Sequence, residues 1–133
     1  MPPSAPHAVK PVEFVGSSES DLASFPREAK QTMGYAIYLA QLGQKHQAAK
    51  PLTGQKEFKG AGVLEIVEDF DGDTYRAVYT VKLAGVVYVL HAFQKKSKRG
   101  AETPKQEIDL IKRRLVRARE HYDEHHAKKW NAE

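Results

Sequence analysis

The chain has 133 residues, 41% of them hydrophobic, and a formal net charge of +4. This length predicts a single domain with a core of its own. No apolar run of about 18 residues is present, which excludes a transmembrane helix. Because the chain has no cysteine, disulfides, thiolate metal sites and cysteine nucleophiles are also excluded.

The ends of the chain differ in composition from its centre. Residues 1–11 contain three prolines before Lys10 and no apolar segment, so they are expected to be a flexible leader and not a signal peptide. Residues 12–122 are predicted to form the domain, and residues 123–133 a flexible tail. The protein is expected to be cytoplasmic.

The charge is unevenly distributed. Residues 1–93 carry 9 Lys and Arg against 10 Asp and Glu, whereas residues 94–133 carry 12 against 7. Such crowding of cations is typical of a surface that meets nucleic-acid phosphate. It is equally typical of a solvated basic helix that keeps a protein soluble, and both interpretations stay open.

The first half predicts a short strand and a long helix. The strand covers residues 12–16 and is closed by Gly16. Apolar residues then recur at spacings of three and four, which predicts an amphipathic helix over residues 26–42, with a helical turn before it. Gly43 is expected to end this helix. The polar connection that follows is predicted to hold a short helical turn at residues 46–50.

Three strand-like runs follow, over residues 63–69, 74–83 and 86–93. The gaps between them permit only hairpins, so they predict an antiparallel meander. In the second run one face is expected to carry Tyr75, Ala77, Tyr79, Val81 and Leu83. The third run is apolar on both faces and is therefore predicted to be the central strand.

The sequence "TPKQ", residues 103–106, predicts a capping box at the start of the last helix. The buried stripe of this helix is expected to be Ile108, Ile111, Leu115, Ala118 and Tyr122, with fraying after Tyr122. The arginines of this segment, Arg114 among them, lie largely off the stripe. The predicted class is α+β: an antiparallel sheet with a C-terminal three-strand meander, packed against N-terminal and C-terminal helices.

Cations collect where the last strand ends. They are Lys95, Lys96, Lys98 and Arg99. RNA cleavage needs a base, an acid and cations that hold the extra phosphate charge, and these residue types suit the last of the three roles. Arg76 lies mid-strand nearby, where it either contributes to such a site or forms a structural pair with Glu65.

Histidines at two places are candidates for acid–base chemistry or metal binding. By alternation His91 shares a face with Val87, Val89 and Phe93, so it is either a satisfied buried histidine or an acid–base residue. His121 and His125 are spaced i, i+4, with His126 adjacent, but they lie in the segment expected to fray and lack a zinc-protease motif. We therefore predict no metal site, and no motif indicates a cofactor.

The ordered motifs resemble the RelE/ParE toxin superfamily, in particular its HigB-like, phage-derived branch. That branch shows a Tyr-Arg strand, an "L-H-x-F-x-K-K" strand end and "T-P" at the start of the last helix. Here these are residues 75–76, 90–96 and 103–104. The resemblance spans about residues 12–118 and implies a RelE-like fold.

The resemblance also implies a function. It implies a ribosome-dependent mRNA endoribonuclease that needs no metal and is neutralised by a cognate helix-turn-helix antitoxin. The partners implied are therefore this antitoxin, the ribosome and mRNA. The catalytic residues implied are Arg76, Lys95 and Lys96, and His91 is the candidate for proton transfer. The RNA-binding residues implied are Lys56, Lys59, Phe93, Lys98 and Arg99.

Two departures from the branch keep other functions open. Where the branch reads Glu-Leu-Arg, this chain has Glu65-Ile66-Val67, and no tyrosine follows Phe93 until Tyr122. A non-enzymatic basic module that binds RNA or a partner protein is one alternative. A gyrase inhibitor of the ParE type, on the same fold, is another.

Overall fold

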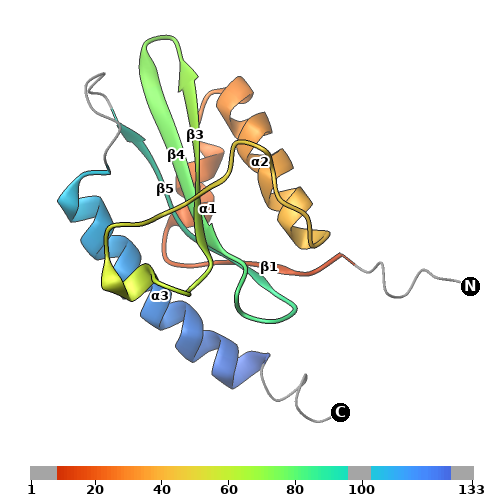
Figure 1. Ribbon diagram of the computed structural model, residues 1–133. Coiled ribbons are helices and arrows are strands. Elements are labelled where there is room, and N and C mark those ends of the chain that lie inside the picture. The colour runs from red at the N-terminus through yellow and green to blue at the C-terminus, as the bar shows by residue number, and fades with distance from the viewer. Residues whose placement is uncertain (1–8, 96–102, 127–133) are drawn as a thin grey trace, which may run out of the picture.

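The structure, a computed structural model, describes residues 9–95 and 103–126. A five-stranded sheet lies between α1 and α2 on one face and α3 on the other (Figure 1). In chain order the elements are β1 (Val12–Phe14), α1 (Ser18–Ala23), α2 (Arg27–Gln41), β2 (Lys50–Pro51), the 3₁₀ helix η2 (Lys56–Phe58), β3 (Val63–Phe70), β4 (Asp73–Thr80), β5 (Val87–Lys95) and α3 (Lys105–His125). The α+β class is confirmed. No helix within the described ranges is long and apolar enough to cross a membrane.

The strand order is β1-β5-β4-β3-β2. The predicted meander is confirmed, because β3 pairs with β4 and β4 with β5, both antiparallel. Asp71 and Gly72 join the first hairpin with φ of 53° and 85°, the positive values of a two-residue turn whose twist suits the strands. β5 is an interior strand as expected, but the middle position belongs to β4. β1 pairs parallel with β5, a contact that strand patterns alone did not predict.

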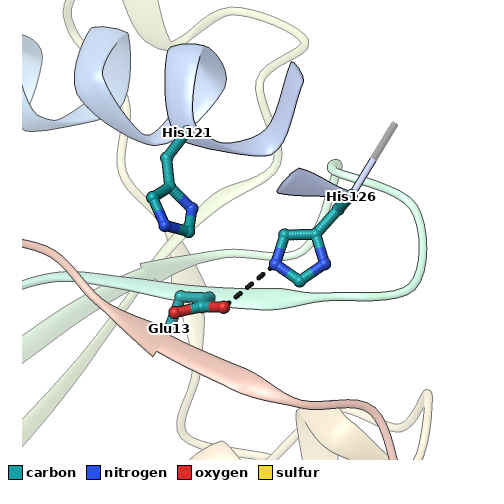
Figure 2. Close-up of side chains that lie close together, drawn as sticks. All are labelled: Glu13, His121 and His126. Carbon is teal, nitrogen blue, oxygen red and sulfur yellow. Dashed lines mark hydrogen bonds and ion pairs between the residues drawn. The ribbon is translucent and has the colours of Figure 1, made fainter. Parts of the chain in front are cut away.

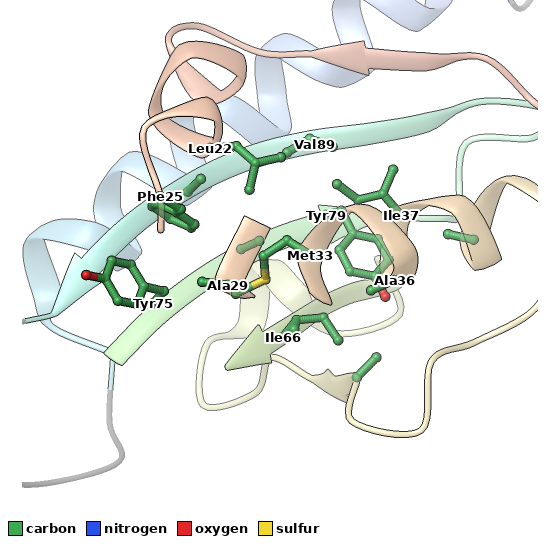
Figure 3. Packing of buried hydrophobic residues seen from close by; sticks show 14 of the residues in the cluster. Leu22, Phe25, Ala29, Met33, Ala36, Ile37, Ile66, Tyr75, Tyr79 and Val89 are labelled. Atoms are coloured by element: carbon green, nitrogen blue, oxygen red, sulfur yellow. The ribbon is translucent and has the colours of Figure 1, made fainter. Parts of the chain in front are cut away.

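Each face of the sheet carries its own hydrophobic cluster. On the first face Met33 and Ala36 of α2 pack over Ile66 and Tyr79 of the sheet, and all four are buried (Figure 3). On the second face α3 buries the stripe predicted for it: Ile108, Ile111, Leu115 and Ala118, with Tyr122 half-buried beside them. Apolar residues at spacings of three and four therefore face the sheet, as helical periodicity requires.

Two predictions about the connections are wrong. Residues 46–49 form a hydrogen-bonded turn that leads into β2, and the helical segment of this connection is η2 (Lys56–Phe58). The second meander strand ends at Thr80, whose hydroxyl donates to the Ala61 carbonyl. Val81 is therefore exposed, and Leu83 packs on the α3 side of the sheet.

The ends of α3 also differ from expectation. The capping box does not form: Pro104 occupies the N-cap, and the Thr103 hydroxyl donates to Glu65 Oε2 at 2.9 Å. The helix does not fray after Tyr122 but continues to His125. The Tyr122 hydroxyl donates to the Ala84 carbonyl at 2.9 Å, and His126 contacts Glu13, so tertiary contacts hold the last turn.

Tyr79 provides a test of the core. Its side chain is 1% exposed, burial raises its pKa to about 12, and its hydroxyl has no hydrogen-bond partner among the described residues. Removing an unsatisfied buried hydroxyl relieves a desolvation cost, so Tyr79→Phe should raise the free energy of unfolding by about 1 kcal/mol. Urea denaturation near neutral pH measures this.

Tyr88→Phe is the matched control, because the Tyr88 hydroxyl is bonded to His121 Nδ1 at 2.7 Å. Its loss should lower the free energy of unfolding by about 1 kcal/mol. Equal destabilisation by both substitutions would contradict the different environments of the two hydroxyls.

Candidate functional site

A β-bulge in β5 decides which side chains face α3. Tyr79 pairs with Val89 while Val78 pairs with His91, so Leu90 is an extra residue in the ladder. One extra residue reverses the alternation of side chains beyond it. His91 and Phe93 therefore lie on the α3 face, opposite to Val89. The predicted shared face of His91 with Val87 and Val89 is wrong, because residue counting assumes an unbroken ladder.

Arg114 of α3 holds the bulge. Its Nη1 donates to the Leu90 carbonyl at 3.0 Å and lies 3.3 Å from His91 Nδ1, and its Nη2 donates to Ser17 Oγ at 3.2 Å. Burial of this guanidinium lowers its pKa. Arg114, which was predicted to lie largely off the buried stripe of α3, is thus a structural link between α3, β5 and the segment after β1.

These contacts define the protonation state of His91. Arg114 can only donate hydrogen bonds, so Nδ1 of His91 must accept and Nε2 carries the proton. Nε2 then donates to Glu107 Oε1, 2.6 Å away. Burial lowers the His91 pKa, and Glu107 opposes that effect. His91 is therefore a neutral imidazole that orients the Glu107 carboxylate, and its ring stacks on Phe93 at a centroid distance of 4.7 Å.

Arg76 is buried in a hydrogen-bonded group on the same face. It is 3% exposed, and its Nη1 lies 3.2 Å from both Glu65 Oε2 and Thr103 Oγ1. The structural Arg–Glu pair considered for this residue is therefore present. Arg76 pairs with Phe93 across β4 and β5, two positions along the sheet from the pair of Val78 with His91. Arg76, Glu65 and Thr103 therefore lie beside His91 and its partner Glu107.

The cationic residues predicted for the site are only partly described. Lys95 pairs with Thr74 at the end of β5, one row beyond Arg76 and Phe93. Lys96, Lys98 and Arg99 lie outside the described residues.

Lys56 and Lys59 are exposed at η2 and line a hollow of about 620 Å³ together with residues 51–55. Residues 51–55 also line a second hollow, of about 520 Å³, with Glu65 and Thr103. The two lysines are thus separated from the Arg76 group by one loop.

An open hollow of about 470 Å³ lies at the end of β5. Its wall includes Asp21, Tyr75, His91, Phe93 and Glu107. The two carboxylates disfavour phosphate inside this hollow, so a nucleic-acid backbone would follow the Lys95 side. A carboxylate that is fixed by an imidazole N–H and lines a solvent-open hollow is suited to accept a proton.

Sequence reasoning missed Glu107, Arg114 and Thr103 as site residues. Glu107 and Arg114 reach the site only because the bulge turns His91 toward α3. Thr103 had been interpreted as a helix cap. No local pattern signals these contacts, since each joins segments that are distant in the sequence.

One group among the described residues can hold a metal ion: Glu13, His121 and His126, whose donor atoms lie within 4.8 Å of one another. It lies at the other end of α3 from Glu107, about 21 Å away along the helix axis at 1.5 Å per residue. Sequence reasoning predicted no metal site, because it paired the histidines with one another and placed them in a fraying tail.

The model of the phage-derived protein Gp49-like family matches residues 20–116. The chain belongs to this family. The phage-derived branch inferred from the sequence motifs is thereby confirmed. Among solved structures, this Gp49-like protein is similar to the toxin–antitoxin complex RelBE2 from Mycobacterium tuberculosis, with 19% identity, a TM-score of 0.43, and coverage of 68% of this chain and 95% of that chain. A comparison with curated proteins gave no match.

The approach of Arg114 to the backbone of this Gp49-like protein predicts the effect of Gly16→Ala. Gly16 has φ +59°, and a Cβ there would lie 2.8 Å from Arg114 Nη2. The guanidinium must then move away from Ser17 and Leu90. The loss of these bonds should lower the free energy of unfolding by about 1–2 kcal/mol, beyond the cost of placing alanine at positive φ.

Gly43→Ala is the control, because Gly43 has φ +80° and nothing within 4 Å of a Cβ. It carries the conformational cost alone. Urea denaturation of both variants gives the difference, and equal losses would contradict the close contact with Arg114.

The lowered His91 pKa predicts a pH dependence of stability. An unfolded histidine titrates near 6.5, whereas burial lowers the value for His91 in the folded protein. Between the two values the unfolded chain binds more protons, so stability falls as the pH drops below about 6.5 and does not recover below the folded pKa. His91→Gln should remove this part of the pH dependence.

Free energies of unfolding from urea titrations at about pH 7.5 and 5.5 measure the effect. His125→Gln, an exposed histidine, is the control and should keep the pH dependence of the unmodified protein. Identical pH dependence in His91→Gln and the unmodified protein would contradict the burial of a neutral His91.

Proposed function

We propose that this protein is the toxin of a type II toxin–antitoxin pair and an endoribonuclease that cuts mRNA on the ribosome. Membership of the Gp49-like family supports the assignment as a toxin, because the motifs of this chain resemble those of the phage-derived branch of toxins. The observation that carries the cleavage hypothesis is the Glu107 carboxylate, held by His91 in an open hollow whose wall ends at Gln94, one residue before Lys95.

The reaction would be attack of an RNA 2′-hydroxyl on the adjacent phosphorus, with departure of the 5′ oxygen. Glu107 accepts the 2′ proton, and His91 positions it through the Nε2–H bond. Lys95 and Lys96 stabilise the charge on phosphate and supply the proton for the leaving oxygen. No metal takes part. In this scheme the ribose lies against the wall that carries Asp21 and Glu107, and the phosphates lie on the side of the lysines.

Arg76 has a different role in this scheme from the one that the resemblance implies. Its Nη1 is hydrogen-bonded to Glu65 and Thr103. These bonds stabilise the end of the sheet beside the hollow. Arg76→Ala would leave the Glu65 carboxylate, whose side chain is 13% exposed, without its cationic partner, at a cost of about 3–5 kcal/mol. Loss of activity in that variant would therefore report on folding, and other positions test the chemistry better.

Glu107→Gln tests the proposed base. Glutamine keeps the size of the side chain and a carbonyl oxygen that accepts the His91 N–H, but it cannot take a proton. Cleavage of mRNA by purified protein on translating ribosomes should fall by about 100-fold or more. Asp109→Asn is the control, because Asp109 is two residues away, exposed to solvent and paired with Lys105, and it should cleave at the normal rate.

Inducible expression of the unmodified chain, with mapping of new mRNA 5′ ends, separates the remaining possibilities. Growth arrest with cuts inside translated codons supports the proposal. Arrest without cuts indicates another target, as in a gyrase inhibitor of the ParE type. Normal cleavage by the folded Glu107→Gln variant would reject Glu107 as the base while leaving the toxin assignment intact.

A non-cleaving binding module is the second candidate, and one observation favours it. Both ring nitrogens of His91, and Nη1 of Arg76, are engaged by protein groups. In this alternative the polar groups on the α3 face serve stability, and the cations after Phe93 bind RNA or an acidic partner. Ribosome or RNA binding without growth arrest or new 5′ ends would favour the binding module.

The proposed partners are the ribosome, its mRNA and a small helix-turn-helix antitoxin, and the proposed location is therefore the cytoplasm. A gene for such an antitoxin directly beside this one would support both toxin alternatives. Co-expression should then rescue growth and yield a complex that contains both chains.

A further inference from the structure

We propose that Glu13, His121 and His126 form a binding site for a divalent transition metal, with Zn²⁺ the best match. The three residues converge from β1, the last turn of α3 and the residue after it (Figure 2). His126 Nε2 lies 2.9 Å from Glu13 Oε2, and all three donor atoms lie within 4.8 Å of one another. This site is independent of the proposed function.

The set of donors suits zinc. Two imidazoles and one carboxylate, with a fourth position for water, form a common zinc coordination sphere. At Zn–N distances of about 2.0–2.1 Å, tetrahedral ligand atoms lie about 3.3 Å apart. One pair of donors here is 2.9 Å apart and no pair is more than 4.8 Å apart, so small side-chain rotations bring them into range. All three side chains are half-buried, which limits competition from water.

Tyr88 holds one of the proposed ligands, His121, in place. Its buried hydroxyl is 2.7 Å from His121 Nδ1, and this contact fixes the orientation of the ring. A hydrogen-bond partner on the second ring nitrogen is typical of histidines that bind metals. Tyr88 also pairs with Glu13 in the β1–β5 register, so the sheet places a ligand beside the residue that orients another ligand.

The surroundings leave room for an ion. A small hollow of about 130 Å³ is lined by Glu13, Tyr88, His121 and Arg117 among others. Arg117 disfavours a cation there, whereas the Glu13 carboxylate favours it. Bound metal would join edge strand β1 to the end of α3, so its expected effect is on stability.

A rival site is the i, i+4 pair His121 and His125, whose ring centroids are 4.3 Å apart. His125 is exposed and lies outside the group that contains Glu13. Substitutions at Glu13 and His125 therefore distinguish the two possibilities, since each removes a ligand from only one of them.

The test is a calorimetric titration of the full chain with ZnCl₂ after removal of bound metal by a chelator. We expect one zinc per chain. Glu13→Gln and His126→Gln should each weaken zinc binding by more than about tenfold, since loss of even an outer partner of a metal ligand can cost that much. His125→Gln, the matched control, should bind zinc as the unmodified chain does.

Thermal unfolding gives a second measurement. Zinc should raise the unfolding midpoint of the unmodified chain and of His125→Gln, but not that of His126→Gln. Circular dichroism of the metal-free variants checks that each is folded. Absence of zinc binding, unchanged affinity in both Glu13→Gln and His126→Gln, or loss of binding only in His125→Gln would overturn the proposal.

Discussion

The bond from Arg114 to the Leu90 carbonyl is the interaction on which the candidate site depends. A bulge leaves a carbonyl out of the strand ladder, and a buried carbonyl without a partner costs about 1–3 kcal/mol. Arg114 satisfies it from α3 and also contacts His91 and Ser17. Because Gly16 has no side chain, the guanidinium can lie against the backbone there. The bulge, the helix and the segment after β1 are thus held by one side chain.

The same guanidinium determines the chemistry that His91 can perform. A donor at Nδ1 excludes the doubly protonated ring, so the imidazole holds a neutral form and directs its single N–H at Glu107. The candidate site is therefore organised around an oriented carboxylate, with Lys95 near its edge. This division of roles differs from a site in which histidine and arginine contact RNA directly, as the resemblance to the toxin family suggested.

α3 links the candidate site to the proposed metal site. Its first turn supplies Glu107 to the hollow at the end of β5, and its last turn supplies His121 beside the start of β5. The buried stripe between these ends anchors the helix on the sheet. Contacts at both ends fix the position of α3 along its own axis. Glu13 and Tyr88 therefore contact the C-terminal end of the same helix that carries Glu107.

Periodicity in the sequence predicted most of the fold, because apolar spacing reflects which face of an element is buried. The long helix, the meander with its hairpins, and the stripe from Ile108 to Ala118 are all as expected. The pairing of Arg76 with Glu65 was also foreseeable, since neighbouring strands must neutralise a buried charge. The predicted roles of Lys56 and Lys59 in RNA binding and of Lys95 in catalysis stay predictions.

The sequence by itself therefore determined the class of fold, the order of its long helices and meander strands, the family and the concentration of cations after Phe93. The tertiary structure decided the face on which His91 lies, the use of Thr103 as a partner of Glu65, and the meeting of Glu13 with His121 and His126. The physical reason is that a bulge and a strand register are properties of two chain segments together. Neither leaves a signal in the local pattern of either segment.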